Sequence, residues 1–153
     1  MKTLIDFTTA MRSALDIAGE AEKSGDIPVG AIVLDVDGKI IGRGHNLRER
    51  DNDPTAHAEI VAMREAADSL GNWRLDGCTL VVTLEPCGMC AGAIAQARIP
   101  RVVFGAWDEK AGAVGSVWDL LRDPRAPFNV EVISGVLEDE CAQILRGFFE
   151  RFR

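Results

Sequence analysis

The first third of the chain shows a helical pattern followed by two short apolar runs. Apolar residues recur at helical spacing from Leu4 to Ala18, and Gly25 follows as a stop signal, which predicts a first helix. An apolar, β-branched run over 29–36 precedes the turn signal Asp37-Gly38, and a second run covers 39–44. Two runs joined by such a turn predict a hairpin of antiparallel strands.

The rest of the chain alternates between helix and strand patterns. After a polar loop over 47–53, Pro54-Thr55 is expected to open a helix that runs to about Leu70, where Gly71 ends it. The predicted elements that follow are a strand over 78–84, a helix from Pro86, a strand over 101–106, a strand over 130–134 and a helix over 138–152. This alternation predicts an α/β fold with three layers, α/β/α, around a central mixed five-stranded sheet.

Composition places the chain among ordinary globular proteins. Its 153 residues are 47% hydrophobic and 27% charged, and no repeat or linker divides them, so we expect one domain over 1–153. No segment approaches the roughly 20 apolar residues of a membrane span, and the first residues lack a signal-peptide core. We therefore expect a cytoplasmic protein with no membrane partner.

The net charge of −7 changes the picture for nucleic acid, because phosphate binding depends on Lys and Arg. Any RNA must meet a local basic patch rather than a broadly basic surface. The candidate basic residues are Arg48, Arg50, Arg98, Arg101, Lys110, Arg122, Arg125, Arg146, Arg151 and Arg153.

Two short segments, each at a predicted helix start, carry metal-binding residues: Pro54-Thr-Ala-His57-Ala-Glu59 and Glu85-Pro86-Cys87-Gly-Met-Cys90. Cysteines at i and i+3 share a helical face, so Cys87 and Cys90 can hold one ion, and His57 can supply a third ligand. Helix N-termini carry partial positive charge, which lowers the pKa of a thiol and favours the thiolates that zinc requires. The sequence therefore predicts one Zn²⁺ in this chain.

Glu59 is the candidate proton carrier beside that ion. It lies two residues after His57, and such neighbours face apart on an ideal helix. At a first turn, however, both side chains can lean past the helix end. A carboxylate there can accept a proton from a zinc-activated water and hand it to a base.

Whether the zinc site is catalytic depends on its fourth position. Catalytic sites keep that position for water, whereas structural sites fill it with a fourth protein ligand. The remaining candidates for a fourth ligand in this sequence are His45, Cys78 and Cys141. A lone glutamate at a helix start is usually a cap, and a lone C-x-x-C is often structural or redox-active, so a structural-zinc binding module is the non-enzyme alternative. The conjunction of H-x-E with P-C-x-x-C is the signature of zinc-dependent base deaminases, and it favours a hydrolase with an open site.

At these residues the chain resembles the cytidine-deaminase-like superfamily, and within it the bacterial tRNA-specific adenosine deaminases that make inosine at the wobble position. The resemblance covers about 6–149 and is carried by Pro28-Val-Gly-Ala31, Asn46, Asp53–Ile60, Val82–Cys87, Met89–Gly92, Arg101–Ala106 and Gly112–Ser116. The zinc motifs are shared by deaminases of several bases. The stretch from Arg101 to Ser116 is what favours the tRNA enzymes.

The resemblance implies zinc on His57, Cys87 and Cys90, with Glu59 moving a proton to N1 of adenine and then to the departing ammonia. It also implies that Asn46 hydrogen-bonds the base, that Val29 packs on its face, and that the backbone near Ala58 completes the pocket. Further contacts to a tRNA anticodon loop are implied for Asp108, Lys110 and Phe149, and the family implies a homodimer.

One residue departs from the pattern of that family, and the net charge leaves another substrate open. Trp107 occupies a position at which the family commonly has a basic residue. A tryptophan there can stack on an RNA base, or it can belong to the core or to an interface. The acidic net charge supports an alternative enzyme, a deaminase of a free base or nucleotide such as guanine, cytosine or a pyrimidine nucleotide.

Overall fold

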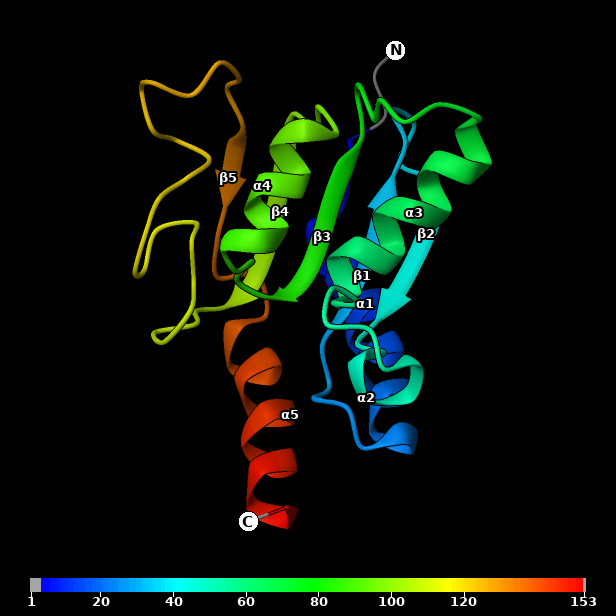
Figure 1. Ribbon diagram of the computed structural model, residues 1–153, viewed down its shortest axis with the longest axis vertical. Coiled ribbons are helices and arrows are strands. Elements are labelled where there is room, and N and C mark those ends of the chain that lie inside the picture. Colours follow the sequence, from blue (N-terminus) through cyan, green and yellow to red (C-terminus); the bar gives the residue numbers. More distant parts are fainter. Residues whose placement is uncertain (1–3, 153) are drawn as a thin grey trace.

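The computed structural model describes residues 4–152, which form a mixed five-stranded sheet with helices on both faces (Figure 1). Its strands lie in the order β2-β1-β3-β4-β5. Strand β1 is antiparallel to both β2 and β3, whereas β3, β4 and β5 run parallel to one another. The strand bounds are β1 Gly30–Leu34, β2 Ile40–His45, β3 Thr79–Leu84, β4 Arg101–Ala106 and β5 Glu131–Ile133. The prediction of a mixed five-stranded sheet is confirmed.

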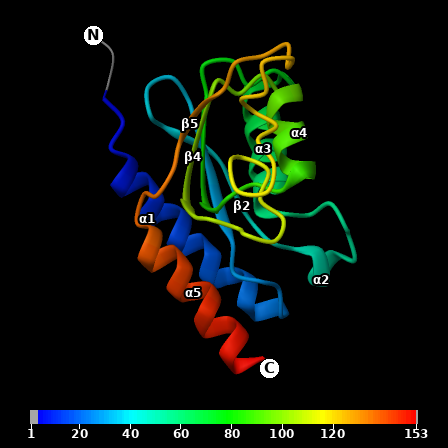
Figure 2. The same ribbon diagram turned by 90° about the vertical axis from the view of Figure 1, so that its left-hand side faces the viewer.

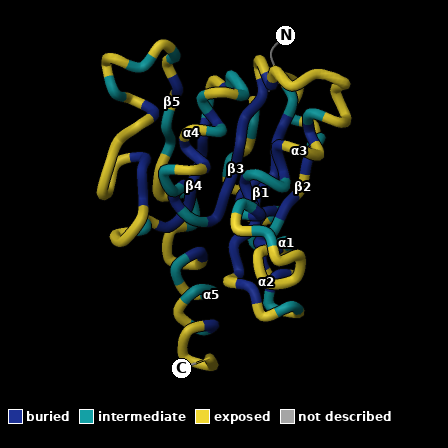
Figure 3. Tube along the Cα trace, viewed as in Figure 1, coloured by how far each residue is buried: buried dark blue, intermediate teal, exposed yellow. Residues whose placement is uncertain are grey.

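Each face of the sheet is covered by two longer helices (Figure 2). Helices α1 (Phe7–Ala18) and α5 (Glu138–Arg151) lie on one face, and α3 (Ala58–Leu70) and α4 (Gly88–Gln96) lie on the other. The buried segments follow the central strands β1, β3 and β4, whereas the edge strands β2 and β5 are less buried (Figure 3). One apolar cluster packs under α3 and α4 around Leu80 and Phe104, and a second packs under α1 and α5 around Met11 and Val103. The three-layer prediction is confirmed.

The structure corrects the predicted starts of three helices and adds two short ones. Helix α1 begins at Phe7, after its N-cap residue Asp6, rather than at Leu4. Helix α3 begins at Ala58 rather than at Pro54-Thr55, because the Asp53 carboxylate accepts hydrogen bonds from the Thr55 amide (2.8 Å) and hydroxyl (2.7 Å) and closes a turn there. Helix α4 begins at Gly88 rather than at Pro86. A four-residue helix, α2 (Arg48–Asp51), occupies the predicted loop, and a 3-10 helix, η1 (Gly19–Ser24), follows α1.

Helix α3 approaches strand β2 so closely that only glycine fits at Gly44. A methyl group there would overlap the carbonyl oxygen of Ala58 and would lie 2.6 Å from the amide nitrogen of Ala62. Since Ala58 follows His57 directly, this contact also sets where the start of α3 lies over the sheet.

We expect Gly44→Ala to destabilise the protein because the backbone of α3 would have to move away from β2. The expected loss is at the upper end of the roughly 1–3 kcal/mol typical of overpacking, which lowers the melting temperature by about 6–12 °C. Gly92→Ala is the matched control, since Gly92 lies in α4 with nothing within 4 Å of the added methyl. Thermal unfolding of both variants checks this prediction, and equal melting temperatures for Gly44→Ala and the wild type would contradict it.

Two of the four cysteines belong to the core. Cys78 and Cys141 are both buried; burial raises the pKa of the Cys141 thiol to about 12 and raises the pKa of Cys78 as well. A raised thiol pKa keeps the protonated, unreactive form dominant at neutral and mildly alkaline pH. We therefore expect iodoacetamide at pH 8 to label neither residue in the folded protein and both after denaturation, as read by peptide mass spectrometry. Rapid labelling of the folded chain would refute this assignment.

Candidate active site

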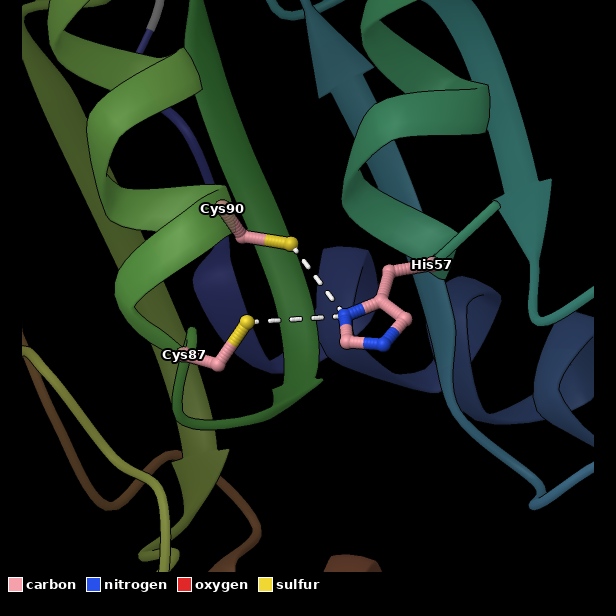
Figure 4. Close-up of side chains that lie close together, drawn as sticks. All are labelled: His57, Cys87 and Cys90. Atoms are coloured by element: carbon pink, nitrogen blue, oxygen red, sulfur yellow. Dashed lines mark hydrogen bonds between the residues drawn. The ribbon is translucent and has the colours of Figure 1, made fainter. Parts of the chain in front are cut away.

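Three predicted metal ligands meet between the N-terminal ends of α3 and α4 (Figure 4). His57 is the residue before α3 and has an extended backbone, while Cys87 is the residue before α4 and Cys90 lies in its first turn. The Nδ1 atom of His57 lies 3.5 Å from the Sγ atom of Cys87 and 3.5 Å from that of Cys90. The tertiary structure thus brings together residues that are 30 and 33 positions apart.

The spacing of these atoms fits a zinc ion. With Zn–S bonds of about 2.3 Å and Zn–N bonds of about 2.0–2.1 Å, tetrahedral ligands place nitrogen and sulfur about 3.6 Å apart. The observed 3.5 Å separations agree with that geometry. Over the described residues 4–152, the cluster contains these three ligands and no fourth; His45, Cys78 and Cys141 are not part of it. A zinc ion held here keeps one position for water or substrate, which is the arrangement of a catalytic site.

The electrostatics of the cluster favour a thiolate at Cys87. The hydrogen bond with Cys90, together with His57 beside it, lowers the pKa of the Cys87 thiol to about 3. The hydrogen bond with Cys87 also raises the pKa of His57. A thiolate next to an imidazole is the donor chemistry that Zn²⁺ binds.

Glu59 lies beside this cluster and is buried, with 4% of its surface exposed. Burial raises the pKa of its carboxyl group to about 7, and the neighbouring charges that act on it include His57 and Cys87. The i, i+2 spacing from His57 does not separate the two side chains, because His57 precedes the helix with ψ of 155° and so lies outside helical geometry. A carboxyl group with a pKa near neutrality suits proton transfer in both directions.

Asn46 connects the start of α3 to the segment before β1. Its Oδ1 atom accepts a hydrogen bond from the Ala58 amide at 2.9 Å, and its Nδ2 atom donates one to the Ile27 carbonyl at 2.9 Å. The Ala58 N–H is therefore already paired. Val29 is 4% exposed and belongs to the apolar cluster that also contains Ala58. These three residues form a packed unit beside His57.

The loop over 107–116 carries two further predicted site residues. The Asp108 carboxylate accepts hydrogen bonds from the amides of Lys110 (3.1 Å) and Ala111 (3.2 Å), and Lys110 itself is exposed. Trp107 is 41% exposed and packs edge-on against Phe104, with ring centroids 4.9 Å apart. Its side chain therefore contacts the core through Phe104 and is partly exposed to solvent.

Phe149 lies on α5 rather than in this loop. It is 47% exposed, and α5 projects past the end of the sheet at which the metal ligands lie (Figure 1).

Sequence reasoning missed the role of Glu85, which was noted only as the residue before Pro86. Glu85 is buried, and its two carboxylate oxygens accept hydrogen bonds from three backbone amides of the 107–116 loop. An acidic residue directly after a buried strand is the one signal in the sequence that pointed to such a role.

Comparison with known proteins places this geometry in a family. The sequence model of the cytidine and deoxycytidylate deaminase zinc-binding region matches residues 6–106. The chain is 48% identical to a tRNA-specific adenosine deaminase of Bacillus subtilis over 94% of this chain and 88% of that protein. A tRNA-specific adenosine deaminase of Haemophilus influenzae is 52% identical over 94% and 83% of the two chains. The chain belongs to the cytidine and deoxycytidylate deaminase family, and its relatives there include tRNA-specific adenosine deaminases.

Solved structures of deaminases have the same fold. One, from studies of A-to-I editing by tRNA:A34 deaminases at the wobble position, superimposes with a TM-score of 0.86 at 45% identity, over 90% of this chain and 99% of that one. A guanine deaminase from Nitrosomonas europaea superimposes with a TM-score of 0.79 at 28% identity, over 96% and 86%. The predictions of a cytidine-deaminase-like fold, a zinc cofactor and a deaminase enzyme are confirmed.

Proposed function

We propose that this protein hydrolyses the exocyclic amino group of adenosine at the wobble position of a tRNA anticodon, giving inosine and ammonia, within one domain that spans 1–153. The observation that carries the proposal is the open His57–Cys87–Cys90 cluster with Glu59 buried beside it, in a chain about half identical to tRNA-specific adenosine deaminases. The three ligands would hold one Zn²⁺ per subunit, which supplies Lewis-acid activation of a water molecule as nucleophile.

Glu59 moves the protons in this reaction. Its carboxylate takes a proton from the attacking water and delivers it to N1 of adenine as C6 becomes tetrahedral. A second proton leaves the new C6 hydroxyl group and passes through Glu59 to the amino nitrogen, so that the C6–N bond breaks, ammonia leaves and the C6 carbonyl forms. A pKa near 7 allows Glu59 to accept and release protons at neutral pH without a large free-energy cost for either step.

Asn46 and its neighbours recognise the base in this proposal. An amide oxygen has two lone pairs and an amide nitrogen has two hydrogens, so the bonds to Ala58 and Ile27 leave Asn46 one acceptor and one donor position for a base. Val29 packs on the face of the base. Ala58 contributes by holding Asn46 in place and by its backbone at the pocket edge.

Contacts with the anticodon loop come from a few residues rather than from a basic surface. Of the ten basic candidates, five pair with nearby acids: Arg50, Arg101, Arg122, Arg125 and Arg151. Arg98 stacks on Phe128 at 3.8 Å, and Arg153 lies outside the described residues. Within residues 4–152, Arg48, Lys110 and Arg146 form no ion pair, and the Nη1 atom of Arg48 lies 3.4 Å from Nε2 of His57.

Of these three residues, Arg48 lies beside His57 and Lys110 lies in the 107–116 loop, whereas Arg146 lies on α5, so we assign Arg48 and Lys110 to RNA phosphates. Asp108 is assigned to the same loop of RNA. Phe149 is an exposed aromatic side chain on which a base can stack, an interaction worth roughly 1–3 kcal/mol.

The proposal includes a homodimer in the cytoplasm. Large apolar side chains are exposed near the start of α4 and in the segment that follows the 107–116 loop: Met89, Val117, Trp118 and Leu120. Such a group of exposed apolar residues is typical of a protein interface. Within the described part of the chain, no helix is long and apolar enough to cross a membrane. Sedimentation analysis of the wild type and of Trp118→Glu tests the dimer, which the substitution should weaken.

The test of the reaction uses zinc-loaded protein and an anticodon stem-loop with adenine at the wobble position. Nuclease digestion followed by liquid chromatography and mass spectrometry should detect inosine. A stem-loop with the adenine moved one nucleotide along the loop is the control and should give no inosine. Absence of inosine from the first substrate, with zinc content verified, would reject the proposal.

A second candidate function is deamination of a free base or nucleotide such as guanine, cytosine or a pyrimidine nucleotide. The guanine deaminase that superimposes over most of both chains favours it, as does the acidic net charge. Ammonia release from guanine, adenine and cytosine under the same conditions separates the two functions, because a tRNA enzyme should convert the stem-loop far faster than any free base.

A further inference from the structure

Glu85 is a buried acidic residue between a strand and a metal ligand. It follows β3 directly, it is 2% exposed, and only Pro86 separates it from Cys87. Its backbone amide continues the pairing with β4 by donating to the Ala106 carbonyl at 2.8 Å. Its main chain is therefore fixed to the sheet.

Over residues 4–152, the hydrogen bonds that the Glu85 carboxylate accepts all come from backbone amides of the 107–116 loop. Its Oε1 atom accepts from Asp108 at 3.0 Å, and its Oε2 atom accepts from Val114 at 3.0 Å and from Ser116 at 3.1 Å. Within the described residues it forms no ion pair with a basic side chain. One buried acidic side chain thus joins both ends of the loop.

The loop closes tightly around this carboxylate. A methyl group at Gly112 would overlap the Glu85 carboxylate, so a glycine is required where the loop passes over it. The Ala113 amide donates to the Pro86 carbonyl at 2.8 Å, and Gly112 forms an antiparallel β-bridge with Cys87. These backbone contacts attach the loop to the segment that carries the predicted zinc ligand Cys87.

We infer that Glu85 is a positioning residue: it holds the 107–116 loop, with Asp108 and Lys110, at a fixed place relative to Cys87 so that the loop receives the RNA substrate. The inference rests on the proposed function, because Asp108 and Lys110 are assigned there to the anticodon loop. Within the described residues, no hydrogen bond joins the Glu85 side chain to a metal ligand or to Glu59, so its effect is on substrate binding rather than on proton transfer.

Glu85→Gln tests the inference, because an amide keeps the shape of the carboxylate but turns one acceptor into a donor that faces a backbone N–H. We expect amide hydrogen exchange in the 107–116 loop to rise about 10-fold or more, while exchange in α3 stays unchanged. We also expect the KM for the wobble-adenine stem-loop to rise about 10-fold or more, while kcat changes by less than about 3-fold. Zinc content should equal that of the wild type.

Three more variants sharpen the result. Glu109→Gln makes the same chemical change at an exposed residue of the same loop and should leave loop exchange unaltered. Glu65→Gln, at an exposed residue of α3 outside the loop, is the control for substrate binding and should leave KM unaltered. Glu85→Asp keeps an acceptor-only carboxylate, one methylene shorter, and should restore part of the loop protection that Glu85→Gln loses.

Several outcomes would overturn the inference. Unchanged loop exchange in Glu85→Gln would mean that the carboxylate does not hold the loop, and exchange that rises across the whole protein, or loss of zinc, would mean a general structural role. Faster loop exchange without a change in KM would mean that the loop does not receive substrate. If the wild-type chain does not convert the stem-loop at all, the proposed function is rejected. The hydrogen-exchange measurement does not depend on that activity, and it then decides by itself whether Glu85 holds the loop.

Discussion

Replacing Glu59 with alanine should reduce kcat by about 10²–10⁴-fold, the usual contribution of a general acid–base residue, and should leave the zinc content unchanged. Glu59 is buried beside the metal cluster, but the three ligands are His57, Cys87 and Cys90. Losing it removes the proton carrier without removing a ligand. Inosine formation from the stem-loop, together with zinc determined by inductively coupled plasma mass spectrometry, checks both halves of the prediction.

Two further variants separate chemistry from packing. Glu59→Gln keeps the side-chain volume in the buried site and should lose as much turnover as the alanine variant, because an amide cannot accept and release the proton. Glu65→Gln makes the same change on an exposed part of α3 and should keep wild-type activity. Substantial turnover in Glu59→Gln would refute the assigned role.

Replacing Cys87 with serine should reduce the zinc content to roughly a tenth or less of the wild-type value, and activity should fall in proportion. A serine hydroxyl stays protonated at neutral pH, whereas the low pKa of Cys87 supplies a thiolate. Two protein ligands do not retain the ion as three do. Cys90→Ser should behave in the same way, since its Sγ atom lies as close to His57 as that of Cys87 does.

The control for this prediction is Cys78→Ala, which removes a buried cysteine that is not part of the metal cluster. It should retain one zinc ion per chain, with at most a modest loss of stability. Full zinc occupancy in Cys87→Ser would show that Cys87 is not a ligand. The contrast with Glu59→Ala is diagnostic, because that variant loses turnover and keeps zinc.

The sequence-based prediction is wrong where a turn signal and a helix signal fall on the same residues. Pro54-Thr55 is a plausible helix start, but the Asp53 carboxylate accepts hydrogen bonds from both Thr55 donors and closes a turn there. The helix therefore begins only at Ala58. The segment predicted as a loop over 47–53 forms the short helix α2. The buried Asp26, 23 residues earlier, accepts a 2.7 Å hydrogen bond from the amide of Glu49 there. A contact at that separation in sequence leaves no periodic signal.

The buried polar residues show a second kind of limit. Asn46 and Glu85 are each ambiguous in the sequence, since an asparagine after a strand is often a turn residue and a glutamate before a proline is often exposed. In the structure both side chains are satisfied by backbone groups from other segments. Burial and partners, which depend on the whole fold, decide their roles.

The alternation of strands and helices and the donor types of the metal site could be predicted from the chain, because side-chain periodicity and the i, i+3 spacing of Cys87 and Cys90 are local properties. Three features depend on the fold: His57 meets these cysteines at 3.5 Å, no fourth ligand joins them within the described residues, and the Glu85 carboxylate accepts hydrogen bonds from the 107–116 loop beside them. These contacts follow from the order of the strands in the sheet. Placing β3 between β1 and β4 puts the starts of α3 and α4 side by side on one face, and such an arrangement is set by packing between segments far apart in sequence.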